Sequence, residues 1–384
     1  MPVIWEPARS GEAARWCALA RSVAVEHFAP LVEELDREQR YPWESVKVLI
    51  QTGLAGLFVD KEFGGQGASF DVVCAVIEEV SRVCPSTGAI LTAYALGGTP
   101  VTLAGTPAQR QKYLGGLAAG KAVSFALTEV GAGSDAARIK TTAVREGDGW
   151  RLAGQKIYIG NGGASQYYVV FALTDPAAGS RGITAFMVDK DDDGVVIDRY
   201  EDKMGLRGTY TSNLKLNTVV PGDAMIGALN RGMGLAMRTL NAGRITVAAQ
   251  SVGVALAAYD IGSREAGRRQ TFGTPIIDNQ GISFPLADVA TRITAARMIT
   301  TEAAQRYAAG GDVSILGAMA KLYASEAAHE SANLAVQVFG GDGYCKPCPA
   351  ERLYRDQRIL EIYEGTSEIQ RLVIGRAVKA EAAT

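Results

Sequence analysis

The chain has 384 residues and a mass of 40.5 kDa, which suits two or three packed domains better than a single core. A composition of 47% hydrophobic and 21% charged residues supports a sizeable core and excludes a disordered or fibrous chain. The 39 basic and 41 acidic residues nearly balance, so we expect no binding of nucleic acid.

Charged residues interrupt every long apolar stretch, so we expect no membrane span. Residues 1–9 lack the basic and apolar regions of a secretory signal. Five cysteines without a regular framework favour a reducing compartment, and we therefore expect a cytoplasmic protein. Since His27 and His329 are the only histidines, we expect no metal site.

Amphipathic runs separated by helix breakers predict an N-terminal helical domain over residues 1–122. Gly53 suits a helix C-cap, Pro85 ends one helix and Pro107 opens another. The predicted helices cover residues 12–38, 43–52, 70–83 and 107–117.

Short apolar runs between turn residues predict a middle antiparallel β-sheet domain over residues 123–232. A hairpin signal lies in the run Glu146-Gly147-Asp148-Gly149. The predicted strands cover residues 124–128, 141–144, 150–153, 167–173, 183–188 and 213–219.

Long helical patterns return after Gly232 and predict a C-terminal four-helix bundle over residues 233–384. Apolar residues at helical spacing mark helices around Val252 and Val289, and further helices are predicted over residues 313–338 and 366–379. The predicted fold class is therefore an α+β multidomain protein in the order helical, sheet, helical.

A glycine-rich loop follows the predicted strand that begins the middle domain, in the run Ala126-Leu127-Thr128-Glu129-Val130-Gly131-Ala132-Gly133-Ser134-Asp135. The glycines allow backbone N–H groups to approach a ligand, and the Thr128 and Ser134 hydroxyls can donate to it. An ordinary strand–loop junction would contain the same residues, so the loop by itself leaves both interpretations open.

A second motif joins a loop to the last helix, in the run Tyr363-Glu364-Gly365-Thr366-Ser367-Glu368. Thr366 is a good N-cap, and Glu368 falls in the first turn, where an anion is favoured. Glu364 lies before a glycine and beside apolar residues, where partial burial would raise its pKa toward the range of a general base. A solvated glutamate is the alternative.

Together the two motifs resemble the acyl-CoA dehydrogenase family of flavoproteins, and the resemblance covers nearly the whole chain. Further matches in the same order are Phe63-Gly64-Gly65-Gln66-Gly67, Lys203-Met204-Gly205-Leu206-Arg207-Gly208, Arg269-Gln270-Thr271-Phe272-Gly273 and Gln337-Val338-Phe339-Gly340-Gly341. The resemblance implies FAD as cofactor and α,β-dehydrogenation of an acyl-CoA thioester. It also implies a homotetramer that passes electrons to an electron-transfer flavoprotein.

The same resemblance implies where the cofactor binds. One set of residues would lie against the flavin, and Arg269, Thr271 and Phe272 would be offered to the FAD of a neighbouring subunit. The implied cofactor-binding residues are Phe125, Leu127, Thr128, Gly133, Ser134, Tyr158, Ile159, Gly160, Arg269, Thr271, Phe272, Gln280, Gln337, Gly340, Gly341, Thr366 and Glu368.

The catalytic base implied by the resemblance is Glu364, which would take the α proton while a hydride passes to flavin N5. A related branch of the family carries its base at the position of Gly243, which cannot act. The implied substrate-binding residues are Ser134, Asn241, Arg244, Tyr363 and Gly365.

The acyl pocket would be floored by Ala89, Thr92, Tyr94 and Leu96, and Tyr94 would shorten it for a short or branched acyl group. Alternatives within the fold are an enzyme that acts on a carrier-protein thioester or is reoxidised by oxygen. A flavin-binding protein without catalysis is the alternative from another class, and Glu364 argues against it.

Overall fold

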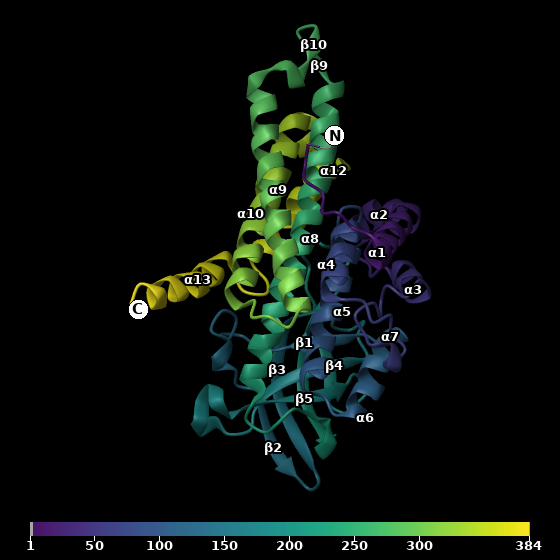
Figure 1. The fold of residues 1–384 in the computed structure, drawn as a ribbon. Coiled ribbons are helices and arrows are strands. Elements are labelled where there is room, and N and C mark those ends of the chain that lie inside the picture. The colour runs from purple at the N-terminus through teal and green to yellow at the C-terminus, as the bar shows by residue number, and fades with distance from the viewer. Residues whose placement is uncertain (1–2, 384) are drawn as a thin grey trace.

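The computed structural model describes residues 3–383 and confirms the predicted fold class, with helices at each end and a sheet between them (Figure 1). In the N-terminal domain, short 3₁₀ and π-helical turns link several of the helices. The α-helices are α1 (Gly11–Val23), α2 (Val32–Glu38), α3 (Trp43–Gln51), α4 (Phe70–Ser81), α5 (Pro85–Ala104), α6 (Pro107–Gln109) and α7 (Gly115–Ala118).

Helix α5 has no counterpart among the helices predicted from periodicity. Pro85 opens it, as a proline at the first helical position can, and Cys84 is its N-cap. The helix packs against α4, the long C-terminal helix α8 (Gly232–Arg268) and the first strand, so nearly all its sides are buried. A helix that is apolar all round carries no 3.6-residue stripe, which is why the pattern missed it.

The middle domain is a mixed sheet with the strand order β6-β7-β3-β2-β4-β5-β8, and β1 pairs with β4 in parallel. Most other pairs are antiparallel, and Glu146 pairs with Gly149 at the predicted hairpin. The strands are β1 (Val123–Ala126), β2 (Thr142–Glu146), β3 (Gly149–Gly160), β4 (Tyr167–Leu173), β5 (Ile183–Asp189), β6 (Val195–Tyr200), β7 (Thr211–Pro221) and β8 (Met225–Ile226). The sequence patterns did not predict β6, which is mostly exposed, or the two-residue β8.

Helix α8 is the centre of the C-terminal domain, beside α9 (Gln280–Ala308) and α10 (Ser314–Phe339). It is long and apolar enough to cross a membrane, but it is mostly buried inside the protein, as the core helix of a domain is. The remaining elements are β9 (Gln270–Thr271), β10 (Thr274–Pro275), α11 (Gly341–Tyr344), α12 (Pro349–Gln357) and α13 (Ser367–Glu381). In Figure 1 the β9–β10 hairpin and α13 extend from the body.

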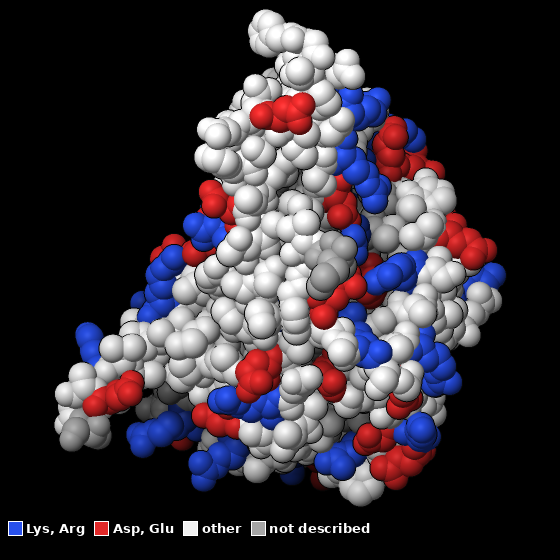
Figure 2. Space-filling view, turned by 45° about the horizontal axis from the view of Figure 1, so that its top comes forward, with Lys and Arg blue, Asp and Glu red and all other residues white. Residues whose placement is uncertain are grey.

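The surface face in Figure 2 carries interspersed acidic and basic side chains around a broad uncharged area. Large apolar side chains that are exposed on α9 and α10 include Phe284, Met298 and Met319. Phe272 in the β9–β10 hairpin is fully exposed.

Candidate active site

Glu364 lies in a short segment between a 3₁₀ turn (Arg358–Glu361) and α13. Its backbone is left-handed, with φ of 54°, and that of Gly365 has φ of 92°. Thr366 is the N-cap of α13, as predicted, because its hydroxyl accepts a hydrogen bond from the Ile369 N–H at 3.3 Å. The two left-handed residues turn the chain so that the Glu364 side chain enters the protein interior.

The Glu364 carboxylate faces Gly243 of α8. A Cβ atom at Gly243 would lie 2.9 Å from Glu364 Oε2 and 2.9 Å from Leu96 Cδ1 of α5. Oε2 is buried and has no hydrogen-bond partner among the described residues. The glycine therefore provides the space that the carboxylate occupies, and a buried polar atom without a partner indicates a place for a ligand.

The pKa of Glu364 depends on its burial and on two nearby cations, Arg244 and Lys321. Burial raises the pKa of Glu364 to about 7, although Arg244 and then Lys321 act to lower it. Arg244 is itself buried, and its Nη1 atom donates to Asn241 Oδ1 at 2.9 Å. Its Nε atom has no hydrogen-bond partner within residues 3–383. A carboxyl group with a pKa near 7 can take up a proton at neutral pH, as a general base must.

Of the residues expected to floor the acyl pocket, Leu96 lies beside Gly243 and the Glu364 carboxylate, whereas Tyr94 points elsewhere. Residues two positions apart on a helix are about 200° apart around its axis, so Tyr94 lies opposite Leu96. Tyr94 is buried in the core beside Tyr41. The face of Leu96 also carries Ala89 and Ala93, and these are among the few residues of α5 that are not fully buried. Tyr94 therefore does not shorten the pocket.

The two segments expected against the flavin lie together at one end of the sheet. The Ile157 N–H donates to the Thr128 carbonyl at 2.9 Å, and the Ser124 hydroxyl donates to the Gly160 carbonyl at 2.7 Å. A Cβ atom at Gly133 or Gly160 would meet nothing within 4 Å. The glycine loop and the end of β3 therefore border open space, and α5 joins this region to Glu364, since Gly97 packs on Val123 while Leu96 reaches Gly243.

A buried ion pair between Lys156 and Glu129 lies at the start of the glycine loop. Lys156 Nζ lies 2.7 Å from Glu129 Oε1 and also donates to the carbonyl groups of Phe171 and Leu127. Glu129 accepts further hydrogen bonds from the Lys140 and Thr141 N–H groups. Burial by itself would raise the pKa of Glu129, but Lys156 and these hydrogen bonds hold it below its usual value.

Of the other residues expected to bind the cofactor, Thr366 and Glu368 lie at the start of α13 beside Glu364, whereas Arg269 and Gly340 lie together at the far tip of the C-terminal domain. Arg269 Nη1 donates to the Phe339 carbonyl at 2.8 Å, which brings Arg269 beside Gly340. Arg269 follows Arg244 by 25 positions along α8 and its C-cap, which is about 37 Å at ~1.5 Å per residue. The tip therefore lies far along α8 from Gly243, against which the Glu364 carboxylate packs.

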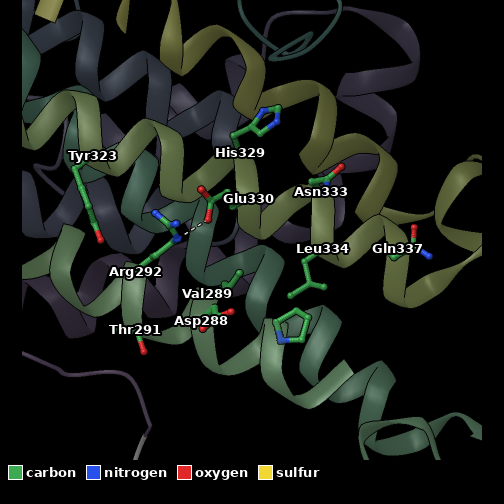
Figure 3. A pocket seen from close by; sticks show the side chains of 11 residues that line it. Asp288, Val289, Thr291, Arg292, Tyr323, His329, Glu330, Asn333, Leu334 and Gln337 are labelled. Atoms are coloured by element: carbon green, nitrogen blue, oxygen red, sulfur yellow. Dashed lines mark ion pairs between the residues drawn. The ribbon is translucent and has the colours of Figure 1, made fainter. Parts of the chain in front are cut away.

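A groove of about 720 Å³ lies between α9 and α10 on the same domain, crossed by an ion pair of 2.6 Å between Arg292 and Glu330 (Figure 3). Gln337 lines one end of it. Glu364 does not line this groove, so the catalytic candidate lies elsewhere.

Several residues at the site were not predicted from the sequence, namely Lys321, Gln370, Gln250 and Lys156. Lys321 and Gln370 both donate to the Gly365 carbonyl at 2.8 Å, and Gln250 accepts a hydrogen bond from the Tyr363 hydroxyl. For Lys321 a signal was present, because it is a lysine in the small-residue stripe Gly317, Lys321, Ala324 and Ala328. A charged residue on a buried helix face requires a partner.

Three family models match the chain in order. They are the N-terminal domain of acyl-CoA dehydrogenases over residues 11–121, the middle domain over 124–219 and the C-terminal domain over 230–379. Together with the buried Glu364 carboxylate and the open space along the glycine loop, these three matches identify the chain as an FAD-dependent oxidoreductase. The chain belongs to the acyl-CoA dehydrogenase family.

The chain is 43% identical to a 3-(aryl)acrylate reductase of Clostridium sporogenes, over 93% of this chain and 95% of that protein. It is 40% identical to a short-chain specific acyl-CoA dehydrogenase of Clostridium acetobutylicum, with the same two coverages. Among solved structures, butyryl-CoA dehydrogenase from Megasphaera elsdenii has a TM-score of 0.95 and 36% identity, over 97% of this chain and 100% of that one.

Proposed function

We propose that this enzyme carries out α,β-dehydrogenation of a short or branched acyl-CoA thioester, with Glu364 as the base. The single observation that carries the proposal is the buried Oε2 atom of Glu364, which has no hydrogen-bond partner in the part of the chain that the structure describes and fills the space left by Gly243. Relatives that are named as short-chain and butyryl-CoA dehydrogenases support the proposed short acyl group.

The chemistry assigned to the chain is removal of the α proton. In this proposal the α C–H bond breaks and its proton goes to the Glu364 carboxylate, while FAD, when bound, supplies the acceptor for the β hydride. Arg244 lowers the pKa of the carboxyl group against the larger effect of burial, which favours its ionised form before the reaction. We also propose that residues 125–134 and 158–160 hold the flavin, largely by backbone groups.

Anaerobic mixing with thioesters tests the function directly. Short acyl-CoA substrates should bleach the flavin absorbance of the purified protein faster than long-chain ones. If long-chain acyl-CoA thioesters reduced the flavin fastest, the proposed preference for short or branched acyl groups would be refuted. If only carrier-protein thioesters reduced it, the carrier-protein alternative would be favoured.

A second candidate is the reverse direction, reduction of an arylacrylate-type double bond, because one relative with 43% identity is named for that reaction. The same site serves both directions. Reoxidation of the dithionite-reduced enzyme by arylacryloyl thioesters, faster than any acyl-CoA reduces it, would favour this candidate.

Gly243→Ala should lower thioester-driven flavin reduction about tenfold or more, because the added Cβ would displace the Glu364 carboxylate or Leu96. Stopped-flow absorbance measures the rate. Gly234→Ala, on the same helix and with nothing within 4 Å of its Cβ, is the matched control. Equal rates in the two variants would contradict the assigned geometry.

We propose a homotetramer, or at least a dimer, in which the tip of one chain completes the FAD site of another, with an electron-transfer flavoprotein as electron acceptor. The separation of about 37 Å along α8 supports this arrangement. Arg269→Ala should weaken FAD binding in every subunit, as measured by fluorescence titration. Arg268→Ala is the control, since Arg268 is exposed and pairs with Glu265. Light scattering that finds a monomer with fully bound FAD would refute the shared site.

A further inference from the structure

Lys321 is a fully buried lysine beside the Glu364 segment. It lies on α10 one helical turn after Gly317, whose Cβ position is 3.4 Å from the Asn241 carbonyl of α8. Its Nζ atom donates one hydrogen bond, to the Gly365 carbonyl at 2.8 Å. A buried ammonium group is costly unless a negative charge compensates it, and burial lowers the pKa of Lys321 to about 8.

The backbone that Lys321 holds is the one that carries Glu364. Gln370 of α13 donates to the same Gly365 carbonyl at 2.8 Å and to the Glu364 carbonyl at 3.3 Å. The left-handed backbone of a residue other than glycine persists only where its surroundings hold it. Two donors, one charged and one neutral, therefore hold this turn from two different helices.

We propose that Lys321 is a positioning residue for the reaction, which holds the Glu364–Gly365 turn and keeps the Glu364 carboxylate ionised. This inference rests on the proposed role of Glu364 as the base. Lys321 has no assigned contact with the substrate, so it acts through Glu364.

The charged groups around Lys321 and Glu364 determine in which direction the loss of Lys321 shifts the pKa of Glu364. Arg244 on α8 and Lys321 on α10 both lower the pKa of Glu364 against the larger effect of burial. The carboxylates of Glu364, Glu361 and Glu368 raise the pKa of Lys321 and so favour its charged form, whereas Arg244 lowers it. Loss of Lys321 therefore raises the pKa of Glu364, so that a smaller fraction of the base is ionised at pH 7.

Two matched variants separate charge from positioning, because Lys321 and Gln370 donate to the same oxygen at the same distance. In wild type, flavin reduction by butyryl-CoA should rise with pH through a midpoint near 7. Lys321→Met should move this midpoint upward by about one unit or more. Gln370→Leu should lower the rate at all pH values without moving the midpoint.

A second readout does not depend on turnover. Infrared difference titration, with Glu364→Gln to assign the band, should show the Glu364 carboxyl group titrating at higher pH in Lys321→Met than in wild type. Lys321→Arg should restore both midpoints at least in part.

An unchanged titration midpoint of Glu364 in folded, FAD-loaded Lys321→Met overturns the proposal, as does an equal shift in Gln370→Leu. If the Met variant does not fold, the same infrared titration is made on Lys321→Arg and Gln370→Leu. Both midpoints should then stay near 7, and a shift in Gln370→Leu alone overturns the role of charge. Failure of the proposed function is distinct, because Glu364→Gln would then still reduce its flavin.

Discussion

Replacing Glu364 with glutamine should lower the rate of anaerobic flavin reduction by an acyl-CoA thioester about 10²–10⁴-fold, the usual loss when a general base is removed. Glutamine has nearly the same shape, so the Gly243 space stays filled and FAD binding should persist. Stopped-flow absorbance measures the reduction, and flavin fluorescence measures cofactor binding.

The control for this variant is Glu302→Gln, an exposed glutamate on α9 that pairs with Arg306. It should reduce its flavin at the wild-type rate. Near-normal bleaching in Glu364→Gln would mean that the base lies elsewhere, and the role assigned to this residue would be wrong.

Lys156→Met should destabilise the protein by about 3–5 kcal/mol, the typical cost when one partner of a buried ion pair is removed. Glu129 would remain as a buried carboxylate that still accepts hydrogen bonds from the Lys140 and Thr141 N–H groups. The glycine loop that begins after Glu129 would lose its support, so FAD affinity should also fall. Thermal denaturation followed by circular dichroism measures the loss of stability.

The pH dependence of this loss identifies its cause. In wild type the Glu129 pKa lies below its usual value, whereas without Lys156 burial would raise it. Protonation at low pH then removes the uncompensated charge, so the deficit should shrink as pH falls from 7 toward 5. Adding Glu129→Gln should recover part of the stability, and Lys47→Met, at an exposed lysine on α3, should cost less than about 0.5 kcal/mol. A deficit that is independent of pH would contradict this mechanism.

Local patterns were sufficient for the order of the domains and for most strands. The run 167–173 was predicted with the bounds that β4 has, because uninterrupted apolar residues between turns carry a clear strand signal. The Glu364 motif was also found from the sequence. Glu364 follows apolar residues and precedes a glycine and the N-cap of the last helix, so helix capping does not explain it. Helix α5 was missed because burial on every side removes the periodicity on which the prediction depends.

The sequence by itself determined which residue types are available at the site: one carboxylate before a glycine, a glycine loop and an Arg-x-Thr-Phe-Gly run. Only the tertiary structure decided how they meet. It brought Glu364 against Gly243, turned Tyr94 away from the pocket, and brought Lys321 to Gly365 across 44 positions of sequence. The physical reason is that pKa and orientation depend on burial and on long-range partners, and neither is encoded in local spacing.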